Sequence, residues 1–243
     1  MRAVFIADAH IRGLDDPNQK TLCEFLDSFY NDTPDKVIVL GDLMDFWTGF
    51  NDVVYYHYLP LLSALSRLGG KGVEIIYLEG NHDFSMGKFF TDVVRARVYP
   101  GACELALDGK RIFLCHGDMV DMRPGYRILR GLLRSVFFKT LTKILPPSVI
   151  WKAAALFSET SKALRYEGIE RELKKFASTK VLEGYDMAVF GHSHIPALDT
   201  EESGKGTGGY ANPGSFSADR SYLVYEGGRF RLERYGAGEN PPE

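Results

Sequence analysis

Five of the six histidines in this chain lie in short polar segments that each follow an apolar run. These segments are DAH (8–10), GNHD (80–83), HGD (116–118) and GHSH (191–194), and GDLMD (41–45) is a fifth polar segment without histidine. Imidazole and carboxylate groups without thiolates suit Mn, Fe, Zn or Co better than Ca or Mg alone. One histidine in such a place is more often structural, but five of them predict a metal site.

The candidate ligands outnumber what one metal ion needs. Asp8 and His10 are two positions apart, and the histidines of GHSH repeat that spacing. In extended chain, residues two apart point to the same side. Two ions about 3.5–4 Å apart, bridged by a carboxylate, would use all of the candidates. Besides the first pair, the candidates are Asp42, Asn81, His116, His192 and His194.

Short apolar runs precede most of the polar segments and predict strands that are buried on both faces of a sheet. The runs are AVFIA (3–7), KVIVL (36–40), VEIIYL (73–78), RIFLC (111–115) and DMAVF (186–190). Helix-length segments at 19–30 and 55–68 alternate with them, which predicts a layered α/β sheet. Because ligands bind beyond the carboxyl ends of strands in such sheets, the polar segments are expected to converge on one site.

Residues 123–165 interrupt this pattern and are strongly basic, with nine lysines and arginines and one acidic residue. Arginines recur every three to four residues from Arg123 to Arg134, so one face of a helix is predicted to be basic and the other apolar. Pro146 and Pro147 are expected to end that helix. A basic face beside apolar residues suits anionic phospholipid headgroups, and an apolar groove suits acyl chains.

The remaining C-terminal segments GGYANPGSF, SYLVYEG and RFRLERY are predicted to form short antiparallel strands with Gly-rich turns. The expected organisation is therefore a core with one insertion. The core is predicted to comprise residues 1–120 and 176–243, and the helical insertion, or lid, residues 121–175.

Composition excludes several other classes of protein. The chain has 243 residues, a hydrophobic content of 45% and a net charge of −3, which argues against attraction of the whole protein to nucleic acid. Its three cysteines have no CxxC spacing, so a thiolate metal site is not expected. So small and odd a number of cysteines predicts a protein of a reducing compartment. No uncharged apolar stretch reaches 18 residues and no secretory signal is visible, so neither a membrane span nor export is expected.

The motifs DxH, GDxxD, GNHD, an isolated His-Gly and GHxH, in this order, resemble those of the calcineurin-type metallophosphoesterases. The resemblance implies a four-layer α/β sandwich of two mixed sheets flanked by helices. It also implies that Asp42 bridges two metals and that a metal-activated water attacks phosphorus in line. One metal would be held by Asp8, His10 and His194, and the other by Asn81, His116 and His192.

In the same family, the histidine of GNHD is not a ligand. The resemblance therefore implies that His82 stabilises charge at the scissile phosphate and protonates the leaving oxygen. Asp45 would orient it, which makes His82 and Asp45 the predicted catalytic pair. Asp83 and Asp118 are interpreted as residues that support the ligands.

The motif spacing, with a helical insertion before GHSH, is similar to that of the UDP-2,3-diacylglucosamine diphosphatases of lipid A synthesis. This resemblance implies two Mn²⁺ ions, with Fe or Zn as alternatives, and hydrolysis to UMP and 2,3-diacylglucosamine 1-phosphate. It implies a cytoplasmic enzyme, peripheral on the inner membrane, whose insertion takes up two acyl chains. The substrate contacts that it implies are Asn81, His82, Arg123, Tyr126, Ser158 and Lys162.

The chain also differs from those diphosphatases. They usually carry Arg where this chain has His82, Glu where it has Asp45, and a GDW-like stretch where it has NPGSF (212–216). The substrate could therefore instead be another nucleotide diphosphate, or a soluble phosphodiester or phosphomonoester. A non-catalytic scaffold is disfavoured because all seven ligands are present. A nuclease is disfavoured because basic and aromatic residues are interleaved only in the insertion.

Overall fold

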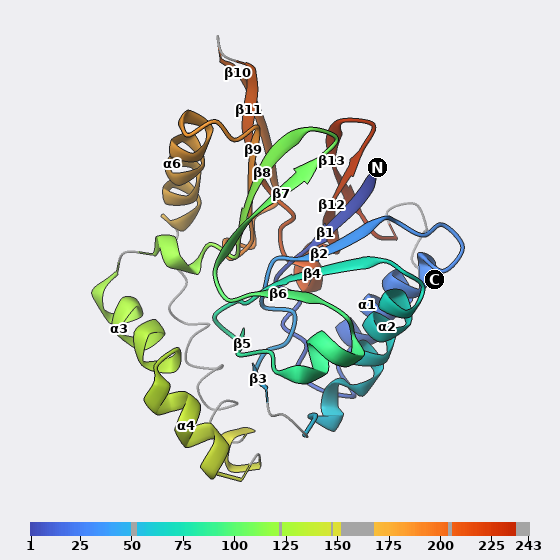
Figure 1. The fold of residues 1–243 in the computed structure, drawn as a ribbon, viewed down its shortest axis with the longest axis vertical. Helices are drawn as coiled ribbons and strands as arrows, with labels where there is room; N and C mark the ends of the chain where they lie inside the picture. Colours follow the sequence, from blue (N-terminus) through green and yellow to red (C-terminus); the bar gives the residue numbers. More distant parts are fainter. Residues whose placement is uncertain (50–52, 122, 147, 152–167, 204–205, 237–243) are drawn as a thin grey trace, which may run out of the picture.

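Two mixed β-sheets form the centre of the computed structural model, which describes residues 1–49, 53–121, 123–146, 148–151, 168–203 and 206–236 (Figure 1). The six-stranded sheet has the order β13-β12-β1-β2-β4-β6, and the five-stranded sheet has the order β10-β11-β9-β8-β7. The first comprises β1 (Arg2–Ile6), β2 (Lys36–Val39), β4 (Glu74–Leu78), β6 (Arg97–Tyr99), β12 (Ser221–Glu226) and β13 (Arg229–Arg234). The second comprises β7 (Ala102–Leu107), β8 (Lys110–Cys115), β9 (Met187–Phe190), β10 (Ala197–Ser203) and β11 (Gly206–Asn212).

Alternate residues of the central strands enter two different hydrophobic clusters. In β1, Val4 and Ile6 pack in a cluster with residues of helices α1 (Pro17–Ser28) and α2 (Leu59–Gly70). Ala3 and Phe5 pack in a second cluster with residues of β8 and β9. Since both faces of the strand are buried, its sequence is continuously apolar rather than alternating.

A third helix, α6 (Ile169–Leu182), adds its buried side chains Ile169, Leu173 and Ala177 to the second cluster, which includes residues from both faces of β8 and β9. The structure therefore has helices on both outer sides of a pair of mixed sheets, which confirms the predicted fold class. The shorter elements are β3 (Trp47–Thr48), β5 (Asp83–Phe84), η1 (Tyr56–Tyr58), η2 (Phe89–Val93), η3 (Asp118–Val120) and α7 (Phe216–Asp219).

Where the sequence predicted one helix that ends at Pro146 and Pro147, the described residues form two, α3 (Pro124–Leu133) and α4 (Val136–Ile144) (Figure 1). The interruption between α3 and α4 has a local cause. Ser135 is the N-cap of α4, and its hydroxyl accepts a hydrogen bond from the Phe138 amide at 3.1 Å. A serine in this position satisfies a free amide and so favours a new helix start.

The predicted boundary of the insertion at residue 175 falls inside α6, whose first turn at Ile169 is already buried in the core cluster. Residues 152–167 lie outside the described ranges. None of the helices within those ranges combines the length and the apolar character that crossing a membrane requires.

Candidate metal centre

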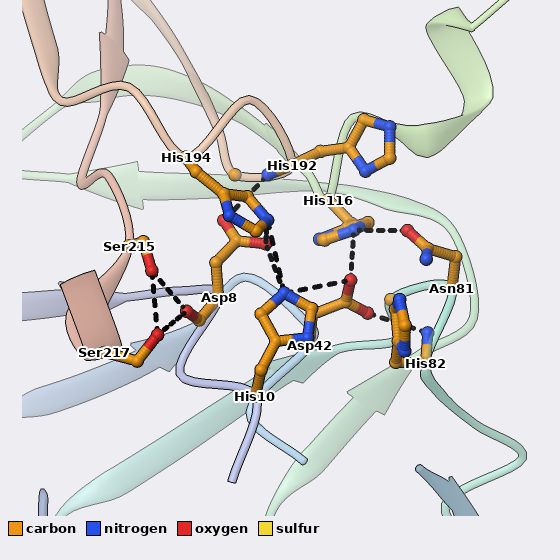
Figure 2. Close-up of polar contacts among 12 residues, drawn as sticks. Asp8, His10, Asp42, Asn81, His82, His116, His192, His194, Ser215 and Ser217 are labelled. Atoms are coloured by element: carbon orange, nitrogen blue, oxygen red, sulfur yellow. Dashed lines mark hydrogen bonds and ion pairs between the residues drawn. The ribbon is translucent and has the colours of Figure 1, made fainter. Parts of the chain in front are cut away.

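The predicted ligands gather where five strands end at their carboxyl termini (Figure 2). Strands β1, β2 and β4 are parallel neighbours, and so are β8 and β9 in the other sheet. Parallel strands bring the loops that follow them to one edge. The ligands therefore come from both sheets of the sandwich. Asp8 follows β1, Asp42 follows β2, Asn81 follows β4, His116 follows β8 and His192 follows β9.

Five of these residues have a left-handed backbone conformation, which is unusual for residues other than glycine. Their φ angles are 53° at Asp8, 45° at His10, 54° at Asp42, 68° at His192 and 60° at His194. This conformation costs about 1–2 kcal/mol per residue, and it clusters at functional sites. Main-chain hydrogen bonds hold it in place, such as the one from the Asp8 amide to the Gly41 carbonyl at 3.2 Å.

The first group of ligand atoms belongs to Asp8, His10 and His194, and these atoms lie within 4.8 Å of one another. The Nε2 atoms of the two imidazoles are 3.2 Å apart, and Nε2 of His194 is 3.4 Å from Oδ1 of Asp8. The other oxygen of Asp8 accepts a hydrogen bond from the His192 amide at 2.8 Å. One carboxylate oxygen is therefore held by the main chain, and the other faces the two imidazoles.

The second group contains Asp42, His116 and His192, with Asn81 beside them. Nδ1 of His116 donates to the Leu40 carbonyl at 2.7 Å, which leaves Nε2 to face the site. That Nε2 is 3.0 Å from Oδ1 of Asn81 and 3.3 Å from Oδ2 of Asp42. A main-chain carbonyl that fixes the imidazole tautomer in this way is typical of histidines that bind metal.

Asp42 lies between the two groups. Its Oδ2 is 3.3 Å from Nε2 of His116 in the second group and 3.9 Å from Nε2 of His10 in the first. Its Oδ1 accepts a hydrogen bond from the His82 amide at 2.8 Å. The carboxylate is therefore in reach of ligand atoms from both groups, as the predicted bridging role requires.

Electrostatics show that this buried cluster is short of positive charge. Burial raises the pKa of Asp8 well above its usual range. Burial and the neighbouring Asp42 carboxylate together raise the pKa of Asp83 to about 6. Burial alone would lower the pKa of His116, but Asp42 outweighs it and raises that pKa to about 10. A cation placed among these carboxylates would relieve their mutual repulsion.

The side chains present fit divalent metal ions. Among the described residues, Asp8 Oδ1 is fully buried and makes no hydrogen bond, which is costly for a carboxylate unless a cation approaches it. The two Nε2 atoms of His10 and His194 point at each other, and a shared cation would satisfy both lone pairs. The donor set consists of imidazole, carboxylate and amide oxygen, which suits Mn, Fe or Zn.

His82 and Asp45 are in contact, and the contact is made by the main chain of Asp45. Nδ1 of His82 donates to the main-chain carbonyl of Asp45 at 2.9 Å. The Asp45 carboxylate faces His10 instead, with 3.7 Å between Oδ1 and Nδ1. Since ligand atoms of His10, Asp45 and His82 also lie within 4.8 Å of one another, distance alone does not separate a catalytic from a ligand role for this pair.

Several supporting residues hold the ligand loops together. Asp83 accepts hydrogen bonds from the amides of Asp42 at 2.9 Å and Leu43 at 2.7 Å, and from the hydroxyl of Tyr77 at 2.5 Å. Asn212 donates to the Gly191 carbonyl at 2.8 Å, which places the NPGSF turn beside the site. The same turn contributes a contact that the sequence did not suggest.

That contact comes from serines. The hydroxyl of Ser215 donates to the main-chain carbonyl of Asp8 at 2.8 Å, and Ser217 lies 3.4 Å from the same atom (Figure 2). Serines are common in Gly-rich turns, so only their place directly after NPG could have drawn attention to them. They help to fix the strained backbone at the first ligand.

Two glycines allow the ligand loops to approach each other. A Cβ atom on Gly80 would lie 2.0 Å from Oδ1 of Asp42 and 2.6 Å from its amide nitrogen. A Cβ atom on Gly41, where φ is 87°, would lie 2.7 Å from Nδ1 of His116. Both glycines are therefore required by space, and Gly41 is also required by its left-handed backbone conformation.

The predicted substrate contacts are only partly described. Tyr126 on α3 has its ring centroid 6.0 Å from that of His192, and its buried hydroxyl makes no hydrogen bond to any described residue. Arg123 pairs with buried Asp121, with 2.6 Å between Nη2 and Oδ2. Ser158 and Lys162 lie outside the described residues.

Comparison with known proteins agrees with this geometry. The model of the calcineurin-like phosphoesterase family matches residues 1–196. The UDP-2,3-diacylglucosamine hydrolase of Aeromonas salmonicida (strain A449) is 27% identical over 208 residues, which cover 82% of this chain and 79% of the relative. The enzyme of the same name from Aeromonas hydrophila subsp. hydrophila is 26% identical, over 97% of this chain and 99% of its own.

Among solved structures, one described as a novel archaeal phosphodiesterase has a TM-score of 0.51 at 16% sequence identity. The match covers 96% of this chain and 99% of that one. At this identity, the likeness concerns the fold alone.

Proposed function

The chain belongs to the calcineurin-like phosphoesterase family, a family of divalent-metal-dependent hydrolases, and on this premise we propose that it cleaves the diphosphate of UDP-2,3-diacylglucosamine to UMP and 2,3-diacylglucosamine 1-phosphate. The observation that carries the proposal is the pair of ligand groups with Asp42 between them, next to a helical insertion. The two relatives named above act on that lipid, according to their names.

In this proposal, Asp8, His10 and His194 hold one ion, Asn81, His116 and His192 hold the other, and Asp42 bridges them. We propose Mn²⁺ as the resident metal, with Fe or Zn as alternatives, because the donors are imidazole nitrogens and oxygens without thiolates. Bound at this site, the ions would supply an activated water and would polarise the phosphoryl oxygens.

Side chains of the protein would supply the remaining catalytic roles. His82 would stabilise the charge that develops on the phosphoryl group and protonate the leaving oxygen. Because its Nδ1 proton is donated to the Asp45 carbonyl, only Nε2 is available to face a substrate, and it can donate a proton only from the imidazolium form. The water oxygen forms a bond to the phosphorus of the UMP side, and the bond from that phosphorus to the bridging oxygen breaks.

We propose that the insertion binds the lipid part of the substrate. Tyr126 supports this, because its ring lies near His192 and its buried hydroxyl has no hydrogen-bond partner among the described residues. Arg123, held by Asp121, would contribute a positive charge close to the same loop. Ser158 and Lys162 remain proposed contacts to the glucosamine and its phosphate.

A direct assay tests the substrate. With Mn²⁺ present, the protein is expected to release UMP from UDP-2,3-diacylglucosamine, and kcat/KM is expected to fall by at least about 10²-fold for UDP-glucosamine without acyl chains. The reason is that each buried CH₂ group contributes about 0.8 kcal/mol to binding. The measurement is UMP release by chromatography, with EDTA as the control and with Zn²⁺ and Fe²⁺ compared under reducing conditions.

The main alternative is a phosphodiesterase or diphosphatase that acts on soluble nucleotides. The observation that favours it is His82, an imidazole where the lipid-specific diphosphatases usually carry Arg. Rapid turnover of bis(p-nitrophenyl) phosphate with no UMP release from the lipid would establish this alternative, and it would leave the metal chemistry unchanged.

We further propose that α3 and α4 rest on an anionic membrane surface. Large apolar side chains on these helices are exposed, namely Ile128 (73%), Leu132 (52%), Phe137 (69%) and Ile144 (74%). An amphipathic helix with such a face and basic neighbours binds at the interface of a bilayer.

The double variant Ile128→Asp/Phe137→Asp is expected to bind vesicles that contain phosphatidylglycerol at least about tenfold more weakly than the wild type. Each such side chain gains about 1.5–3 kcal/mol on burial, and 1.4 kcal/mol corresponds to a factor of ten. Co-sedimentation measures the bound fraction. Leu182→Asp on α6, where leucine is 86% exposed, is the matched control. Equal binding by the double variant and the control would contradict the membrane proposal.

A further inference from the structure

Two arginines at the end of α3, Arg130 in its last turn and Arg134 directly after it, point toward the core. Their side chains are 27% and 18% exposed, whereas Arg127 is exposed. Since the two arginines are four positions apart, they lie on one side of the helix end, a single turn from each other. What they contact is the pair of loops that supplies Asn81 and His116.

Arg134 holds the loop after β4. Its Nη2 donates to the main-chain carbonyls of Gly80 at 2.9 Å and Glu79 at 3.4 Å, and its Nη1 donates to the carbonyl of Pro100. The Gly80 carbonyl belongs to the peptide group that leads into Asn81. A hydrogen bond to this carbonyl therefore fixes the orientation of the peptide from which the Asn81 side chain extends.

Arg130 holds the loop after β8. Its Nε donates to Oδ2 of Asp118 at 2.5 Å, and Nη2 of Arg134 is 3.7 Å from the same oxygen. Asp118 is buried and lies two residues after His116. Both arginines thus meet at one carboxylate, which ties the two loops to each other through α3.

The ligand atoms on these loops are in direct contact. Oδ1 of Asn81 lies 3.0 Å from Nε2 of His116, although the two residues are 35 positions apart in the chain. Within the described residues, the loops also meet at Gly41, whose missing side chain leaves room for Gly80 and His116. A shift of either loop by a few tenths of an ångström would change the geometry of the second ligand group.

We propose that Arg134, assisted by Arg130, is a positioning residue that sets the second metal subsite, so that the helical insertion controls the hydrolytic chemistry itself as well as the lipid. This inference rests on the proposed function, because it takes Asn81 and His116 as ligands. It predicts an effect on substrates that are too small to reach the insertion. A planar guanidinium with several donors is suited to the task, since it can serve two carbonyls and a carboxylate at once.

The test is Arg134→Met in the full-length protein, stripped of metal and titrated with MnCl₂ by calorimetry. One of two Mn²⁺ equivalents is expected to bind about 10–100-fold more weakly, as is typical when a residue behind a ligand is lost. The other equivalent should be unchanged. At saturating Mn²⁺, kcat for bis(p-nitrophenyl) phosphate should fall about tenfold or more, with KM nearly constant. Arg134→Lys, which keeps the charge but lacks the planar arrangement of guanidinium donors, should recover part of both losses.

Arg171→Met is the matched control, because Arg171 is 74% exposed on α6 and lies 3.9 Å from Glu172, its ion-pair partner. This control should leave the affinities of both Mn²⁺ equivalents and the kcat unchanged. If Arg134→Met does not fold, as judged by loss of a cooperative thermal transition, Arg130→Gln carries the same expectations. A folded Arg134→Met variant with two wild-type Mn²⁺ affinities and wild-type kcat overturns the inference, even if its Tm is lower. A wild-type protein that binds no Mn²⁺ overturns the proposed function as well.

Discussion

The substitution Asp42→Asn is expected to lower turnover by more than about 10³-fold and to weaken the binding of both Mn²⁺ ions. A single lost electrostatic contact in an active site costs about 10²–10³ in rate, and Asp42 would serve both ions and thus the nucleophile. Among the residues that the structure describes, its carboxylate lies within 3.9 Å of imidazole nitrogens from both ligand groups. Turnover is measured with bis(p-nitrophenyl) phosphate, so the result does not depend on the identity of the natural substrate.

Asparagine is the informative replacement because it preserves shape. Its amide oxygen can still accept the hydrogen bond that Asp42 Oδ1 receives from the His82 amide at 2.8 Å. It also tolerates the left-handed backbone at this position better than most residues do. The loss of turnover and of metal affinity in Asp42→Asn should therefore result from the missing negative charge. Asp27→Asn, which changes a surface carboxylate paired with Arg67, is the control and should leave metal binding unchanged.

Two observations would contradict the bridging role. The first is that the Asp42→Asn variant still binds two Mn²⁺ ions tightly. The second is that its turnover stays within tenfold of the wild type. Loss of one equivalent with the other intact would instead assign Asp42 to a single ion.

The second large effect is expected at His82. His82→Ala should lower kcat by about 10²–10⁴-fold, which is the usual contribution of one general acid, while both Mn²⁺ ions remain bound. The physical reason is that Nδ1 is committed to the Asp45 carbonyl, so the ring is held in place with Nε2 free to act on the leaving oxygen. Calorimetric titration with Mn²⁺ and steady-state kinetics on the same samples provide the measurement.

A second replacement separates the two parts of that role. His82→Arg supplies a positive charge but cannot give up a proton near neutral pH, because a guanidinium group in a protein stays protonated. If the residue only stabilises charge, His82→Arg should recover most of the activity that His82→Ala loses. His57→Ala, at the one histidine outside the polar segments, is the control. Loss of a whole Mn²⁺ equivalent in His82→Ala would show that His82 is a ligand, which the contact of His10, Asp45 and His82 also allows.

Much of the fold could be predicted because local pattern and tertiary environment agree. The five apolar runs correspond to β1, β2, β4, β8 and β9, with no boundary shifted by more than one residue. Their continuous apolar character reflects burial on both faces, which the two hydrophobic clusters confirm. The predicted C-terminal antiparallel strands correspond to β11, β12 and β13.

What the sequence did not predict depends on contacts between distant parts of the chain. Strand β7 alternates exposed and half-buried residues at the edge of its sheet, so no apolar run marks it. The inward direction of Arg130 and Arg134 follows from carbonyls and a carboxylate that only the folded core presents. Likewise, the atom of Asp45 that contacts His82 is decided by the course of the main chain and cannot be read from residue types.

The proposed ligands come from opposite ends of the chain, which affects when metal can bind during synthesis. Asp8 and His192 are 184 positions apart in sequence, as are His10 and His194, so neither ligand pair exists until most of the chain has been made. At about 5–20 residues per second, the first ligands wait roughly 10–40 s for their partners. Strand β1 waits longer still, because its neighbour β12 includes residues 221–226.

With the proposed ligand set, neither pair can hold an ion until most of the chain has been made. We therefore expect metal loading to follow synthesis as a separate step. Cells that are short of the metal would then accumulate folded, inactive protein that regains activity when the ion arrives, without new synthesis.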